Sequence, residues 1–187
     1  MCRYLIIFLT LHALLLTLHA QDVSFYKENI TMKLEHDYFY VTGDYFLKTT
    51  GDRSVVLVYP FPVDSLYGEV DTIVVYNVTE DQTVEILERR KTGVVFKADF
   101  EENSEIHLLI SYRQKLLGKK AEYILKTTAS WKKPLEQADY QLIVPAAMEV
   151  IDFSIPPDYV MLTGEEQVYY WSRKNYMPSV NMVFGFY

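Results

Sequence analysis

The sequence predicts an all-β protein, an antiparallel, immunoglobulin-like β-sandwich with at most one short helix. Three observations support this fold class. Apolar and polar residues alternate along most of the chain, turn-forming residues recur about once every dozen residues, and aromatic residues are abundant, with 16 Tyr and 10 Phe. A helix would instead need an apolar stripe with a period of 3.6 residues, and no such stripe of useful length occurs.

The alternation defines the strands one by one. Ile30, Met32 and Leu34 alternate with polar residues, and the segment from Ile106 to Tyr112 does the same. A period of two places successive side chains on opposite faces of a sheet. Further strands are expected at 38–48, 54–61, 71–76, 83–88, 94–98, 122–127, 139–144, 148–154, 159–162, 167–173 and 180–186.

Turn-forming residues separate these strands, as at Thr50-Gly51-Asp52 and Thr163-Gly164-Glu165. In Tyr59-Pro60-Phe61-Pro62 two prolines remove ladder donors, so we expect a strand to end there or to lie at an edge, with Phe61 turned inward. The segment 134–138 is the expected site of the short helix, because proline suits a first helical position and Leu-Glu-Gln-Ala forms helices well.

The first twenty residues have the pattern of a secretory signal peptide. Arg3 precedes an apolar run from Tyr4 to Leu18, and Ala20 supplies a small residue at the expected cleavage site. We therefore expect residues 1–20 to be a signal peptide and 21–187 to be one β-sandwich domain, exported to the periplasm or the cell surface. Retention of the apolar run as an N-terminal anchor is the alternative. Cleavage would remove the only cysteine, Cys2, so we expect no disulfide.

Composition excludes several partners and anchors. The net charge of −7 does not favour nucleic acid, and the two dense basic groups, Arg89-Arg90-Lys91 and Lys119-Lys120, are short and turn-like. No later stretch approaches the apolar length of a membrane helix, so no membrane span is expected after signal cleavage. Two triplets match the N-glycosylation pattern, Asn29-Ile30-Thr31 and Asn77-Val78-Thr79, and are interpreted as coincidental.

The residues predict no catalytic, metal or cofactor site. The later chain has two histidines, His36 and His107, without a nucleophile elbow or metal-ligand spacing. The alternative is a carboxylate-dependent glycoside hydrolase, which needs a pair of acidic residues. Candidates for that pair are Glu101-Glu102, Glu165-Glu166, Asp44 and Asp64, most of them in turn-like segments.

Two aromatic segments are candidate contact surfaces. The segment 169–176 combines four aromatic residues with two cations, and Trp131 lies in a loop or helix entrance. Exposed aromatic rings can stack on sugars or anchor a protein partner, whereas alternate rings of a strand can equally face the core. The predicted ligand or partner contacts are Trp131, Tyr169, Trp171 and Tyr176.

Three segments taken together resemble a group of uncharacterised exported bacterial proteins with β-sandwich domains. They are Val58 to Leu66, Ile110 to Gln114, and Ala121 to Thr128 with the downstream Trp131, Pro134 to Glu136 and Ala138 to Tyr140. The resemblance extends to the segments 169–171 and 177–178. It implies export and an all-β fold, and it carries no assigned activity or catalytic residue. Within these segments, we expect Arg113 to pair with a carboxylate, Glu122 or Glu136.

The expected function is therefore that of a non-catalytic binding or structural module of the bacterial cell envelope. Its partner would be another envelope protein or a glycan. The alternatives are the glycoside hydrolase and a carbohydrate-binding accessory domain.

Overall fold

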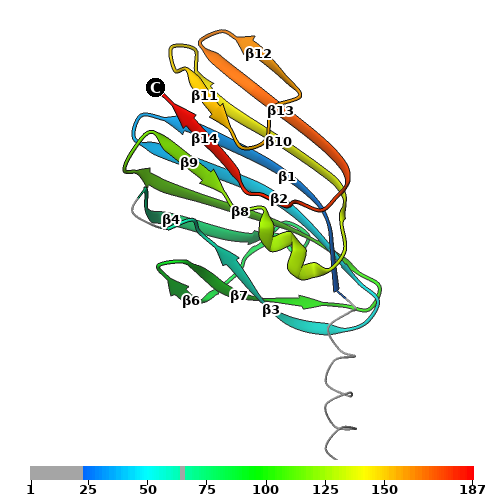
Figure 1. The fold of residues 1–187 in the computed structure, drawn as a ribbon. Coiled ribbons are helices and arrows are strands. Elements are labelled where there is room, and N and C mark those ends of the chain that lie inside the picture. Colours follow the sequence, from blue (N-terminus) through cyan, green and yellow to red (C-terminus); the bar gives the residue numbers. More distant parts are fainter. Residues whose placement is uncertain (1–22, 64–65) are drawn as a thin grey trace, which may run out of the picture.

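The computed structural model describes residues 23–63 and 66–187 and shows a sandwich of one large sheet and two smaller ones (Figure 1). The predicted signal peptide lies outside the described residues. The large sheet has the order β12 (Tyr159–Thr163), β13 (Glu166–Tyr176), β10 (Leu135–Pro145), β1 (Val23–Glu35), β2 (Tyr38–Thr49), β8 (Glu105–Leu116), β4 (Tyr67–Asn77) and β5 (Gln82–Thr83). One smaller sheet has the order β11 (Val150–Phe153), β14 (Met182–Phe186) and β9 (Lys120–Tyr123). The other has the order β3 (Arg53–Pro60), β7 (Gly93–Phe100) and β6 (Ile86–Arg90).

Both smaller sheets pack against the same face of the large sheet. On β2, Phe39 and Tyr45 are separated by an even number of residues and therefore share a face. The ring of Phe39 lies 6.3 Å from that of Phe184 on β14, and the ring of Tyr45 lies 5.7 Å from that of Tyr59 on β3. The core is thus a single layer of side chains between the large sheet and its two-part cover.

The apolar residues of the predicted alternating pattern fill this core. Ile30, Met32 and Leu34 are buried, and the residues between them are more exposed. The prediction of an all-β sandwich with at most one short helix is confirmed. One departure from strict antiparallel order is the parallel pairing of β1 with β10, for example Ile30 with Tyr140.

The predicted helical turn at 134–138 is wrong. Leu135 begins strand β10, and Leu135 and Ala138 are fully buried in the core. Pairing of β10 with both β1 and β13 outweighs the helical propensity of these residues. The short helix is instead the 3-10 helix η1 (Lys126–Trp131), which Lys132 ends with a left-handed backbone conformation.

Two smaller expectations have opposite outcomes. Strand β3 ends at Pro60 and is an edge strand, and Phe61 is buried, as the two prolines predicted. The expected partner of Arg113 is wrong, because its Nε and Nη2 atoms lie 2.9 and 2.8 Å from the carboxylate oxygens of Asp71 on β4. The neighbouring strand supplies this carboxylate, since Arg113 pairs in register with Thr72.

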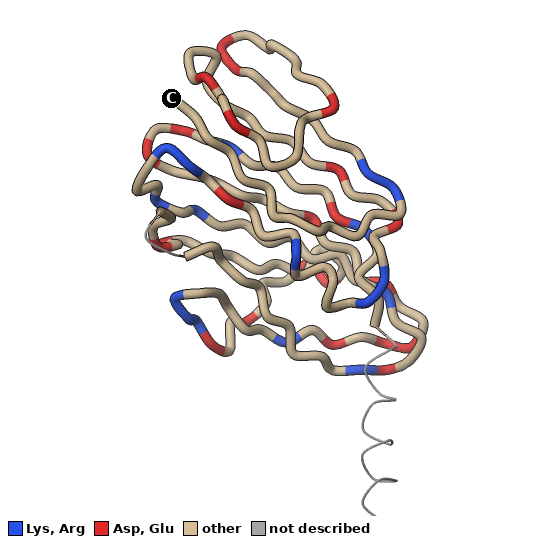
Figure 2. The backbone as a smooth tube through the Cα atoms, in the orientation of Figure 1, with Lys and Arg blue, Asp and Glu red and all other residues tan. Residues whose placement is uncertain are grey.

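Charged residues of both signs are interspersed along the turns and strand ends (Figure 2). The basic group at 89–91 is part of this mixture, since Arg90 pairs with Glu88 and Lys91 with Glu69. In the described part of the chain, no helix is long and apolar enough to cross a membrane.

Candidate ligand-binding cavity

A cavity of about 430 Å³ lies against the large sheet and is open on one side, where the cover over that sheet is interrupted. Strand β3 pairs with β7, strand β9 pairs with β14, and the two smaller sheets are not hydrogen bonded to each other. Strand β3 borders the cavity on one side and the segment from β9 to η1 on the other, above a floor from β1, β2 and β8 (Figure 1). A volume of this size suits a small organic ligand.

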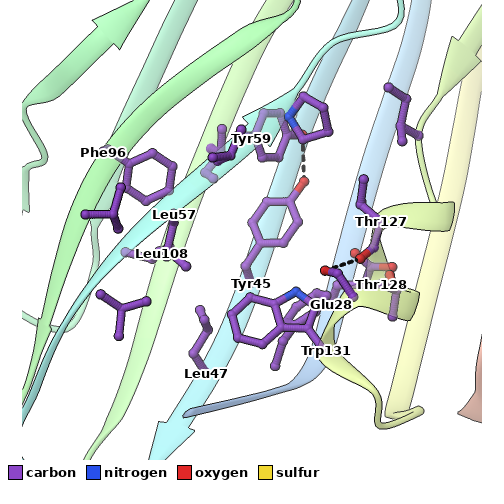
Figure 3. Close-up of a pocket in the computed structure, with 18 of the residues that line it drawn as sticks. Glu28, Tyr45, Leu47, Leu57, Tyr59, Phe96, Leu108, Thr127, Thr128 and Trp131 are labelled. Carbon is purple, nitrogen blue, oxygen red and sulfur yellow. Dashed lines mark hydrogen bonds between the residues drawn. The ribbon is translucent and has the colours of Figure 1, made fainter. Parts of the chain in front are cut away.

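The walls are mainly apolar and aromatic. Figure 3 shows Leu57, Phe96 and Leu108 on one side and Glu28, Thr127 and Trp131 on the other. Six aromatic side chains line the cavity: Phe25, Tyr45, Tyr59, Phe96, Tyr123 and Trp131. Such a lining, with few polar groups, is typical of pockets that take small molecules.

Glu28 is the one carboxylate among the described residues that line the cavity. Its side chain is 2% exposed, and burial raises its pKa from 4.5 to about 7. The hydroxyl of Tyr140 donates a 2.5 Å hydrogen bond to Oε1, and this bond, with a second one from Tyr123, lowers the pKa and partly offsets burial. Both tyrosines are donors to the carboxylate, so the surroundings stabilise the ionised form by hydrogen bonding alone.

Tyrosine hydroxyls continue this polar network along the cavity. The hydroxyl of Tyr45 lies 2.8 Å from that of Tyr59 and 2.9 Å from that of Tyr123. Burial raises the pKa of all three hydroxyls well above the usual value, so they stay protonated near neutral pH. Glycine at position 43 leaves room for the Tyr45 ring, since a Cβ atom there would collide with it.

Trp131 is at the end of η1, where the chain turns into β10. Its ring lies 5.9 Å from that of Phe25 on β1, and the side chain is half-buried against the core. Ser130 supports this turn, because its hydroxyl donates a 2.7 Å hydrogen bond to the carbonyl oxygen of Thr127. The helix therefore holds an aromatic ring against the cavity without burying it completely.

The structure separates the four predicted contact residues. Trp131 lines the cavity, but Trp171 and Tyr169 are 2% and 9% exposed and belong to the hydrophobic core. Trp171 also donates its indole N–H to the carbonyl oxygen of Ile155 at 2.9 Å. Tyr176 is half-buried against the core at the end of β13.

The idea of one exposed aromatic surface is therefore wrong for Trp171 and Tyr169, whose rings face inward on β13. Contact with a ligand stays a prediction for Trp131 and Tyr176. Exposed apolar residues are found on β3, at Val56 and Val58 beside the cavity, and along the edge strand β12 from Tyr159 to Leu162.

The residues that sequence reasoning missed are Glu28, Tyr45, Tyr59 and Tyr123. One signal could have revealed Glu28, since it occupies the same alternating positions as Ile30, Met32 and Leu34. Residues at alternating positions of a strand share one face of the sheet. A carboxylate whose neighbours on that face are apolar therefore points into a core or a binding site. The tyrosines carry no comparable signal, because tyrosine is common on both faces of a strand.

The acidic residues considered for glycoside hydrolysis that the structure describes lie outside the cavity. Glu101, Glu102 and Glu165 are exposed, and Glu166 pairs with Lys33 at 3.3 Å. Asp44 pairs with His107 at 2.6 Å, and Asp64 lies outside the described residues. Across residues 23–63 and 66–187, no cluster of His, Cys, Asp and Glu could hold a metal ion.

Neither the family models nor the curated proteins compared with this chain match it. Among solved structures, one similar protein is a putative nutrient binding protein from Legionella pneumophila, with 12% identity and a TM-score of 0.68 over 90% of this chain and 68% of that one. Another is an M1 zinc metallopeptidase from Deinococcus radiodurans, with 8% identity and a TM-score of 0.55. The match covers 88% of this chain and 42% of the metallopeptidase. At these identities the likeness shows a shared fold and nothing more.

Proposed function

We propose that this protein is an exported, non-catalytic binding module that takes a small organic ligand into the cavity beside Glu28. The observation that carries the proposal is the cavity itself, with its aromatic walls and one buried carboxylate. Pockets that combine an apolar body with few polar groups fix a ligand by shape and orient it by hydrogen bonds.

Two further observations support a binding role. The structurally similar Legionella protein is described as a putative nutrient binding protein, which is compatible with a binding role. The N-terminal pattern of residues 1–20 supports export, and the resemblance to exported bacterial β-sandwich proteins supports an envelope location. An envelope protein or a glycan remains the proposed larger partner.

The cavity gives less support to hydrolysis of glycosides. That reaction uses two carboxyl groups on either side of the scissile bond. Glu28 is the single carboxylate among the described lining residues, and Glu101, Glu102, Glu165, Glu166 and Asp44 are not among them. A binding role requires no second carboxylate.

The test uses the neutral, polarity-sensitive dye prodan as a probe of the cavity. We expect saturable binding with one site per chain and a blue-shifted emission. The substitution Leu57→Trp should abolish it, because Leu57 lines the cavity. Val74→Trp is the matched control, since Val74 is 42% exposed on β4 and outside the lining.

Thermal melting of both variants shows whether each is folded. Trp131→Ala gives a second test if Leu57→Trp does not fold, because it alters the wall without filling the interior. Dye binding that is absent in the unsubstituted protein, or that survives in both folded cavity variants, contradicts the proposal. A glycan array run alongside tests the alternative larger partner, and glycan binding that does not displace prodan would place that partner outside the cavity.

A further inference from the structure

Glu28 is a buried carboxylate whose counter-charge is not among the side chains around it. The described lining of the cavity includes no Lys, Arg or His. The polar groups that reach the carboxylate are the hydroxyls of Tyr140 and Tyr123, which donate hydrogen bonds and carry no charge. A buried charge is normally paired, because its desolvation is costly.

The aromatic lining favours the same kind of ligand. Four rings that line the cavity form a chain: Trp131 lies 5.9 Å from Phe25, Phe25 lies 6.0 Å from Tyr45, and Tyr45 lies 5.7 Å from Tyr59. Aromatic rings attract cations through the negative potential of their faces, and this attraction is strongest where water is excluded. An aromatic cavity with one carboxylate therefore complements an organic cation, because both the ring faces and the carboxylate attract positive charge.

Resting on the function proposed above, we propose that the ligand class is a monovalent organic cation with an apolar body, whose charge is neutralised by Glu28. A neutral ligand would leave the carboxylate without a counter-charge. An anionic ligand would add a second negative charge beside it, which is unfavourable in a site of low polarity.

This assignment has a consequence for pH. The cation binds the ionised form of Glu28, so its affinity rises as pH increases through about 7, the pKa of that carboxyl. The other titratable groups that interact with Glu28 come from β2, β3, β9, β10 and β13 and are the tyrosines Tyr45, Tyr59, Tyr123, Tyr140 and Tyr176. Burial raises the pKa of each tyrosine, so none of them titrates between pH 5 and 9.

The experiment compares benzyltrimethylammonium with its uncharged isostere neopentylbenzene by equilibrium dialysis against the full chain. The two compounds have the same shape and differ in charge, so shape alone cannot separate them. We expect the cation to bind at least about tenfold more tightly at pH 8. The affinity of the cation should fall steadily below pH 7, whereas that of the isostere should not fall.

Glu28→Gln should remove both the preference for the cation and the pH dependence of cation binding. Glu136→Gln is the matched control, because it removes the same charge from an exposed position on β10. Equal affinity for the two compounds, or a preference that survives in Glu28→Gln, overturns the assignment of a cation. If prodan binds and the cation shows no preference, this inference alone fails; if neither prodan nor either compound binds, the proposed function fails with it.

Discussion

The hydroxyl of Tyr140 lies 2.5 Å from Oε1 of Glu28, although the two residues are 112 positions apart in the sequence. Glu28 lies on β1 and Tyr140 on β10, the two strands that pair in parallel. Tyr140 is 3% exposed and Glu28 is 2% exposed, so the bond is formed inside the core. The one described carboxylate of the cavity is thus hydrogen bonded across the pair of strands that joins the two halves of the large sheet.

Removal of this hydroxyl in Tyr140→Phe should destabilise the protein, and more strongly at high pH. The hydroxyl donates to the ionised carboxylate, so its loss should cost about 2 kcal/mol at pH 8 and about 1 kcal/mol at pH 5, where Glu28 is protonated. The pKa of Glu28 should rise in the variant. Urea unfolding at the two pH values measures the difference.

Tyr187→Phe is the control for this variant, because Tyr187 is 73% exposed. It should change the free energy of unfolding little at either pH. An equal loss at pH 5 and pH 8 in Tyr140→Phe would show that the hydroxyl does not respond to the charge of Glu28.

The second prediction concerns stability as a function of pH. Because the pKa of Glu28 is raised from 4.5 to about 7 by burial, the folded protein keeps a proton that the unfolded chain releases. The free energy of unfolding should therefore fall as pH rises between these values, by about 3 kcal/mol in total from this one group. Glu28→Gln should flatten the fall, as measured by urea unfolding from pH 5 to pH 8.

Two carboxyl groups paired with arginine act outside this window. Arg113 and Arg173 lower the pKa of Asp71 and Asp158 below the usual value, so these two groups affect stability at more acidic pH and with the opposite sign. Glu136→Gln should retain the fall seen in the unsubstituted protein. A protein that becomes more stable between pH 5 and pH 7 would rule out the protonated, buried Glu28.

The two tryptophans should behave differently when each is replaced by alanine. Trp171 is 2% exposed and packs against Phe153 and Phe184, so Trp171→Ala should cost about 3–5 kcal/mol of stability. Trp131 is half-buried at the cavity, so Trp131→Ala should cost about 1 kcal/mol and weaken prodan binding. Denaturant unfolding and dye titration of both variants make the comparison. Equal destabilisation would assign Trp131 to the core instead.

The edge strand β12 should promote self-association. Tyr159, Val160, Met161 and Leu162 are each at least 50% exposed on this strand, and Leu162 is 77% exposed. Exposed apolar edge strands pair with other chains, and a lysine at the edge opposes this. Leu162→Lys should slow aggregation, followed by light scattering, and change stability by less than about 0.5 kcal/mol.

Val180→Lys adds the same charge at an exposed apolar residue outside the strands and is the control. It should leave the aggregation rate nearly unchanged. The same slowing in both variants would attribute the effect to net charge instead of to β12.

Much of the fold follows from the alternation of side chains, because burial on one sheet face leaves a direct record in the sequence. Ile30, Met32 and Leu34 are buried as predicted, and Pro60 ends β3. Local propensity failed where a strand pairs on both sides, as at Leu135, because long-range pairing is not visible in a short segment.

The site was harder to predict, because the cavity forms where inward-facing residues of the large sheet are not covered by a strand of the smaller sheets. Trp131 was singled out for its place near a turn, and it does line the cavity. Trp171 was singled out for its aromatic neighbours and is in the core, since the parity that faces inward on β13 is set by the register with β10. Glu28 was overlooked, although its parity matched that of the apolar residues that follow it.

The position of β1 also affects how the polypeptide matures. This strand and its neighbour β2 are synthesised early, but its other neighbour, β10, belongs to the last third of the chain. Until that late segment emerges, one row of amide and carbonyl groups on β1 has no mate, and Glu28 has no Tyr140. Long-range pairing of this kind slows folding and prolongs the lifetime of aggregation-prone intermediates. Completion of the large sheet therefore depends on a segment that is synthesised late.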